Sequence, residues 1–91
     1  MSSEIAAIRR FIRESLGYTD EVDDGQDLLE TGVLDSFNVV EMALFLQQEF
    51  GLDLNADDIS KANFESLTAM QALIGRTRAV QQDAVQQSQG V

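Results

Sequence analysis

The sequence predicts an all-α protein, an antiparallel bundle of three long helices and one short helix. Apolar residues recur at helical spacing in three separate stretches, no stretch has a convincing strand pattern, and proline is absent. Hydrophobic residues make up 44% of the 91 residues, enough for one modest core. We expect residues 1–80 to form the bundle and the glutamine-rich residues 81–91 to form a flexible tail.

The first helix should be capped by Ser2 or Ser3 and should stop near Gly17. Its core stripe, flanked by Phe11, has helical spacing: Ile5, Ile8, Ile12 and Leu16. Three basic residues lie off this stripe, and a solvated helix face explains them better than an anion site. These residues are Arg9, Arg10 and Arg13.

Residues 18–35 have no sustained period and form a long connection of the kind that often carries function. Four of its apolar residues should turn inward, so that the connection crosses the core: Leu28, Leu29, Val33 and Leu34. Its acidic residues suggest a calcium-binding loop, but Val22 and Thr31 stand where that loop needs acidic ligands. We therefore expect no metal site.

The second helix should run from about Ser36 to Phe50, capped by Asp35 or Ser36 and ended by Gly51. One side is apolar without interruption and should face the core: Val39, Met42, Ala43, Leu46 and Phe50. The other side mixes apolar and polar residues, as partner surfaces do: Phe37, Val40, Glu41, Leu44, Gln47 and Gln48. Alternatively, the 18–35 connection covers this second side. Phe45 fits either side.

A short third helix is expected at about residues 56–60, capped by Asn55, with Ile59 and Phe64 as inward anchors. Ser66 should cap the fourth helix. The inner stripe of that helix again has helical spacing: Leu67, Met70, Leu73, Ile74 and Thr77.

Ser36 occupies the most favourable position for chemistry. At the first turn of a helix the backbone N–H groups lack partners and the helix dipole is positive, which suits an anion such as a phosphate ester. The chain has no histidine and no cysteine, so most catalytic triads, disulfides and zinc sites are excluded. Lys61, the single lysine, lies in a distant turn, so a serine hydrolase is the weakest interpretation and we expect no catalytic residue.

The formal net charge is −10, and residues 14–60 contain thirteen acidic and no basic residues. Such a surface repels nucleic acid and anionic membranes, and it attracts partners with basic patches. The chain has no long apolar run and no pattern typical of a signal peptide. We expect a cytoplasmic monomer that binds neither nucleic acid nor membranes.

The stretch DLLETGVLDSF, residues 27–37, precedes a helix, a short Asp-rich turn and a last helix. This order resembles the acyl carrier protein family, which includes aminoacyl and peptidyl carriers, over about residues 4–78. The resemblance implies that Ser36 accepts a 4′-phosphopantetheine arm from coenzyme A, with Asp35 matching the acidic residue beside the attachment site. A separate phosphopantetheinyl transferase makes this transfer with Mg²⁺. The terminal thiol then carries acyl or aminoacyl groups as thioesters between enzymes.

The partners implied are the transferase, a loading ligase, and downstream transferases or synthases with basic docking patches. The docking surface expected on the second helix consists of Phe37, Val40, Glu41, Leu44 and Gln48. Fatty-acid carriers typically have leucine in place of Phe37 and acidic residues in place of Gln47 and Gln48. Loop residues 28–34 look more like those of stand-alone carriers for D-alanine, aminoacyl groups or secondary metabolites. Together these departures favour a stand-alone carrier in specialised metabolism or aminoacyl transfer over primary fatty-acid synthesis. The alternative is a helical interaction module without a cofactor.

Overall fold

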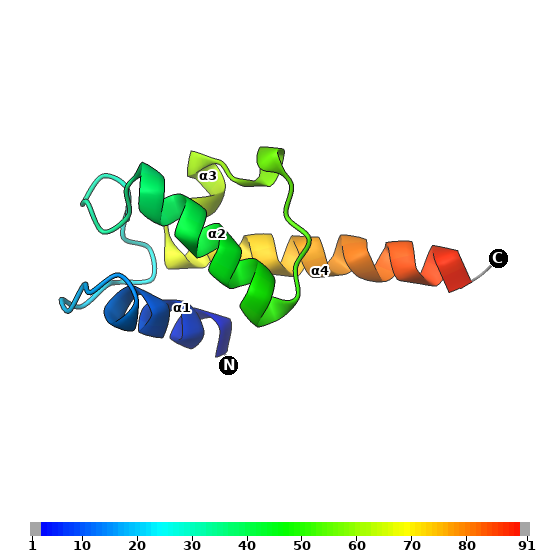
Figure 1. Cartoon of the computed structure of the whole chain (residues 1–91), viewed down its shortest axis with the longest axis horizontal. Coiled ribbons are helices and arrows are strands. Elements are labelled where there is room, and N and C mark those ends of the chain that lie inside the picture. Colours follow the sequence, from blue (N-terminus) through cyan, green and yellow to red (C-terminus); the bar gives the residue numbers. More distant parts are fainter. Residues whose placement is uncertain (1–2, 90–91) are drawn as a thin grey trace.

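A computed structural model describes residues 3–89, and it describes side chains from Glu4 to Gln81 (Figure 1). Within these residues all regular structure is helical, which confirms the all-α fold class. The elements are α1 (Ser3–Glu14), α2 (Ser36–Phe50), the 3₁₀ turn η1 (Ala56–Asp58), α3 (Lys61–Phe64) and α4 (Leu67–Gln89). Among the described residues, none of the helices is both long enough and apolar enough to cross a membrane.

Two predictions from the sequence concern residues that lie outside the described ones. The capping side chains of Ser2 and Ser3 lie outside them, as do the side chains of residues 82–91. The division into a bundle at 1–80 and a flexible tail at 81–91 therefore stays a prediction.

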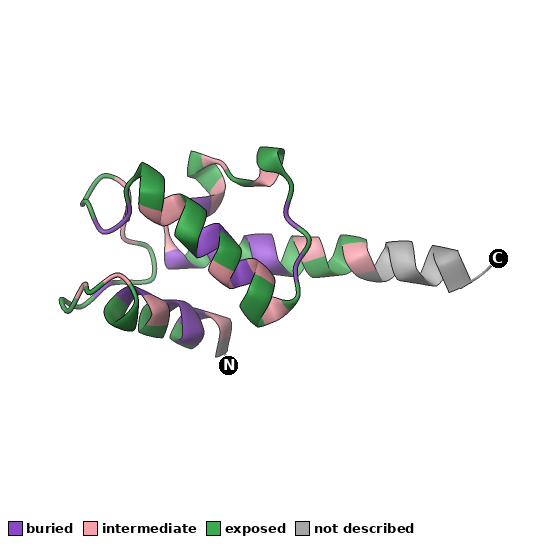
Figure 2. Cartoon of the chain, in the orientation of Figure 1, coloured by how far each residue is buried: buried purple, intermediate pink, exposed green. Residues whose placement is uncertain are grey.

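The three long helices pack around one core (Figure 1). α1 runs antiparallel to α2 and α4, and these two point in the same general direction because segment 51–66 carries the chain back to the start of α4. Figure 2 shows the buried residues gathered on the inner faces of the helices. The side chains with essentially no exposure come from every part of the bundle: Ile8, Leu28, Met42, Leu46, Phe64, Leu67 and Met70.

The end of α1 lies slightly earlier than the sequence suggests. The helix ends at Glu14, and Gly17 then adopts a left-handed conformation with φ of 75°. The backbone N–H of Tyr18 donates to the carbonyl of Ile12 at 3.1 Å, which closes the turn. Gly17 therefore reverses the chain, as expected of a glycine that follows a helix.

The short helix expected at about 56–60 is capped by Asn55 as predicted but is only a 3₁₀ turn over residues 56–58, because a second capping residue divides this segment. Asn55 and Asp58 exchange hydrogen bonds in a closed capping box that holds only the η1 turn. Ser60 is then extended, and its hydroxyl accepts from the N–H of Asn63 at 3.4 Å, so that α3 begins at residue 61. Phe64 is fully buried as predicted, whereas Ile59 is 37% exposed and is not an inward anchor.

α2 buries the face predicted for it, with Met42, Ala43 and Leu46 inside the core. Phe45, which the sequence left unassigned, faces α1. Its ring stacks on Phe11 with centroids 4.4 Å apart and meets Phe50 edge-on at 6.2 Å. This aromatic cluster joins α1 to the C-terminal half of α2.

Candidate functional site

The connection that precedes α2 is anchored in the core. Leu28 and Leu34 are fully buried, and the N–H of Leu34 donates to the carbonyl of Leu28 at 2.9 Å. The N–H of Leu28 in turn donates to the carbonyl of Glu65, just before α4, at 2.7 Å. Leu29 is only partly buried but packs against the same core. The inward turn predicted for this loop is therefore present, and it fixes the residue immediately before Asp35.

A tight turn at Asp27 shapes the loop between these anchors. The Asp27 carboxylate accepts hydrogen bonds from the N–H groups of Leu29 and Glu30, and the Asp27 carbonyl accepts from the N–H and hydroxyl of Thr31. Gly32 follows with φ of 81°. Sequence reasoning treated Asp27 only as one acidic residue among several. The available signal was an aspartate opening a turn that ends in threonine and glycine.

Asp35 is the N-cap of α2. Its backbone is extended, and its Oδ1 accepts from the N–H groups of Phe37 and Asn38, both at 2.9 Å. The expectation of an open anion seat at this helix start is therefore corrected. The carboxylate of Asp35 already occupies two of the N–H groups that a phosphate would have used.

Ser36 is the first residue of α2 and is exposed. Among the described residues, its hydroxyl makes no hydrogen bond, whereas Ser60 and Ser66 use their hydroxyls to cap α3 and α4. The Ser36 hydroxyl therefore stands free at the start of a helix that Leu34 and Asp35 hold in place. An exposed hydroxyl on a fixed backbone suits covalent attachment of a phosphate ester.

The second side of α2 faces solvent. The exposed fractions are 80% for Phe37, 52% for Val40 and 50% for Leu44, so the 18–35 connection does not cover this side. Glu41 and Gln48 are exposed beside them, and Figure 2 shows buried and exposed residues alternating along α2. We call these five residues the α2 stripe.

Gln47 does not belong to this surface, although the sequence places it there. It is half-buried, and its Oε1 accepts from the N–H of Leu54 at 3.2 Å. The Gln47 side chain thus holds the backbone that follows α2, through a hydrogen bond to a residue seven positions away in the sequence.

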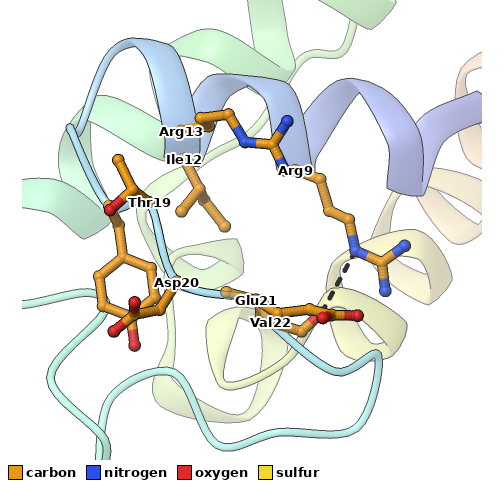
Figure 3. A pocket seen from close by; sticks show the side chains of 8 residues that line it. Arg9, Ile12, Arg13, Thr19, Asp20, Glu21 and Val22 are labelled. Atoms are coloured by element: carbon orange, nitrogen blue, oxygen red, sulfur yellow. Dashed lines mark hydrogen bonds between the residues drawn. The ribbon is translucent and has the colours of Figure 1, made fainter.

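A hollow of about 530 Å³ lies between α1 and residues 18–22 (Figure 3). Arg9 and Arg13 extend over it from α1, while Asp20 and Glu21 line it from the other segment. Arg9 lies on the exposed helix face predicted for it, and it also makes contacts there: its Nε donates to the carbonyl of Val22 at 3.3 Å and its guanidinium pairs with Asp24. Arg9 thereby ties the acidic connection to α1.

A second hollow, of about 490 Å³, lies between residues 53–58 and α4. Ser36 is exposed and lines neither of these two hollows. Within the described part of the chain, no three carboxylates lie close enough together to hold a metal ion.

Comparison with known proteins agrees with this geometry. Residues 6–73 match the family model of the phosphopantetheine attachment site. The chain is also similar to the probable acyl carrier protein PigG of Serratia sp. (strain ATCC 39006), with 32% identity over 63 residues that cover 69% of this chain and 72% of that protein. The matched residues include most of α1, the anchored connection, Ser36, α2, α3 and the first part of α4. The chain therefore belongs to the phosphopantetheine-attachment family of carrier proteins, whose cofactor is a covalently attached 4′-phosphopantetheine.

Proposed function

We propose that the chain is a stand-alone carrier that holds acyl or aminoacyl groups as thioesters on a 4′-phosphopantetheine arm attached to Ser36. The position of Ser36 carries this proposal. Its hydroxyl is exposed, follows the helix cap Asp35 directly, and lies inside the matched region 6–73. The arm supplies the thiol that a cysteine-free chain lacks.

Among its described residues, the chain places no activating base in hydrogen-bond contact with the Ser36 hydroxyl. It contains no histidine or cysteine, and the neighbouring Asp35 carboxylate is engaged with two backbone N–H groups. We infer that a separate phosphopantetheinyl transferase supplies the base and Mg²⁺, and that the chain itself catalyses no reaction. In that transfer the base of the transferase takes the proton of the Ser36 hydroxyl, and the Ser36 oxygen bonds to the phosphorus that carries pantetheine. The pyrophosphate bond of coenzyme A breaks, and adenosine 3′,5′-bisphosphate leaves.

The α2 stripe is the proposed docking surface for the transferase, a loading ligase and downstream transferases or synthases. Its exposed apolar residues stand beside the carboxylate of Glu41, and no basic residue occurs between residues 14 and 60. A partner with an apolar patch rimmed by basic side chains complements such a surface. The stripe begins at Phe37, directly beside Ser36, so that a partner on it can reach the cargo.

The cargo class is proposed from two observations. The relative is named a probable acyl carrier protein, which supports an acyl group. Phe37, Gln47 and Gln48 depart from the residues usual in fatty-acid carriers, which supports specialised metabolism or aminoacyl transfer. We propose a cytoplasmic carrier in such a pathway rather than in primary fatty-acid synthesis.

Intact mass after incubation with coenzyme A, Mg²⁺ and a permissive transferase tests the attachment site. The wild type should gain one phosphopantetheine mass, and Ser36→Ala should gain none while keeping the helical circular dichroism of the wild type. Ser15→Ala is a matched control, because Ser15 is also exposed and follows α1. It should be modified like the wild type. Modification of Ser36→Ala, or a wild type that resists several transferases, would overturn the proposal.

A further inference from the structure

We propose that residues 76–81 of α4 form a clamp that fixes the C-terminal end of α2 and the connection after it. The family match ends at residue 73, but α4 continues beyond it. Three polar side chains in this extension reach other elements of the fold: Arg76, Arg78 and Gln81. The clamp itself does not rest on the proposed carrier function.

Gln81 satisfies the backbone where the chain leaves α2. Gly51 turns left-handed with φ of 65°, so the groups beyond it leave the hydrogen-bond pattern of the helix. The Gln81 Nε2 donates to the carbonyl of Gly51 at 3.1 Å, and its Oε1 accepts from the N–H of Asp53 at 2.6 Å. One side chain thus bonds to both sides of the turn, about 30 residues away in sequence.

Arg78 connects all three long helices. Its guanidinium pairs with the carboxylate of Glu4 at 3.1 Å and lies over the ring of Phe50, 5.4 Å from the ring centre. The pKa of Glu4 is lowered from its ordinary value, first by a backbone hydrogen bond and also by Arg78, while desolvation opposes the shift. α1, α2 and α4 therefore meet at one side chain.

Arg76 extends the clamp to α3. Its guanidinium donates to the Oδ1 of Asn63 at 2.8 Å, while the Nδ2 of Asn63 donates to the carbonyl of Asp58 at 2.9 Å. The return segment is consequently attached to α4 at Gly51, Asp53 and Asn63 by side chains from residues 76–81. We infer that the folded unit extends at least to Gln81.

The clamp matters for α2 because this helix is otherwise held by its N-terminal anchors and its core face. Leu34 and Asp35 fix the end that carries Ser36. Residues 76–81 fix the opposite end, beyond Leu44 and Gln48 of the α2 stripe. If the stripe is the docking surface, its orientation depends on a segment outside the family match.

Amide hydrogen exchange of the full-length Gln81→Ala variant tests the clamp. The Asp53 amide should exchange about two- to tenfold faster, because it loses its hydrogen-bond acceptor. The Leu54 amide is an internal control, since its acceptor is Gln47 and remains in place. Val80→Ala is the matched control variant, because Val80 is the exposed neighbour of Gln81. An Asp53 amide that exchanges no faster in Gln81→Ala, or equally fast in Val80→Ala, would overturn the proposal.

Arg78→Gln provides a second measurement on the same full-length chain. Loss of the Glu4 pair and of the contact with Phe50 should speed exchange in the last turn of α2, with the Val39 amide in its first turns unchanged. Uniform acceleration along α2 would contradict a clamp, since it would indicate destabilisation of the whole bundle.

Discussion

Asp35 and Ser36 are neighbours with different tasks. The Asp35 carboxylate faces into the helix start and satisfies two N–H groups, which leaves Ser36 in the first turn with its hydroxyl free. An arm attached there carries its phosphate charge next to the Asp35 carboxylate. The helix start therefore serves to position the serine, and two of its N–H groups are already used by Asp35.

Asp35 caps α2, and the family resemblance also matches it to the acidic residue beside the attachment site; substitution can separate a capping effect from an effect of its charge on attachment. Asp35→Ala removes the acceptor of two hydrogen bonds and should lower the free energy of unfolding by about 0.5–2 kcal/mol. Asp35→Asn keeps a capping oxygen and should stay within about 0.5 kcal/mol of the wild type. Urea denaturation followed by circular dichroism measures both values.

The rate of phosphopantetheine transfer then distinguishes the roles. We expect the stable Asp35→Asn variant to be modified more slowly than the wild type, because it lacks the negative charge beside Ser36. Transfer at the wild-type rate would mean that Asp35 acts on this site only as a helix cap.

At the scale of elements, α2 is a helix with two apolar faces that lie in different surroundings. Leu46 is fully buried, whereas Val40 is 52% exposed and lies beside the exposed carboxylate of Glu41. Burial of an unpaired carboxylate would cost several kcal/mol, which is why this side faces solvent. Exposed apolar residues gathered on one side of a helix are typical of a docking surface, which is the role proposed for the α2 stripe.

Substitutions on the buried face of α2 should therefore reduce stability, whereas substitutions on the exposed face should reduce partner binding. Leu46→Ala should lower the free energy of unfolding by about 2–5 kcal/mol through a cavity. Val40→Ala and Glu41→Lys should each change it by less than about 0.5 kcal/mol, because both side chains are exposed. Both surface variants should slow modification by the transferase, and Glu41→Lys should also reduce the salt dependence of that rate.

Chemical denaturation and transfer kinetics over a range of salt concentrations check these expectations. Leu46→Ala serves as the control for stability loss. If Val40→Ala unfolds the protein and Leu46→Ala leaves its stability unchanged, the two faces have been assigned the wrong way round. If both surface variants are modified at the wild-type rate, the α2 stripe is not the docking surface for the transferase.

At the scale of the molecule, the charge distribution sets the response to salt. Within the described residues there are two ion pairs, Arg9 with Asp24 and Glu4 with Arg78, in a chain of net charge −10. Exposed ion pairs contribute at most about 1 kcal/mol each to the stability of the fold, so the protein loses little stability when salt weakens them. Repulsion among the many remaining carboxylates is the larger effect at low ionic strength.

Added salt or divalent cations should therefore raise the melting temperature at neutral pH, because screening shortens the range of this repulsion. Thermal unfolding followed by circular dichroism measures the effect, and an uncharged solute at matched osmolality separates screening from solute exclusion. A melting temperature that is independent of salt, or that falls, would show that the carboxylates are already well separated.

Several features could be predicted from the sequence because they depend on residues within one or two helical turns. The three long helices follow from apolar periodicity, the caps at Asn55 and Ser66 from single polar side chains, and the inner face of α2 from its uninterrupted apolar stripe. The position of Ser36 at a helix start is equally local. Segment 56–64 was misread because two caps compete within a few residues, and periodicity cannot rank them.

Other features required the packed structure. Arg9 finds Asp24 fifteen residues away, and Gln81 finds Asp53 twenty-eight residues away. No neighbouring residue encodes such pairs, since long polar side chains can adopt many conformations and the available partner depends on how the helices pack. The exposure of the second face of α2 also depends on packing, because from the sequence this face could be open to solvent or covered by the 18–35 connection. Only the burial of Leu28, Val33 and Leu34 in the core, which draws that connection away from the stripe, determines that the face is open.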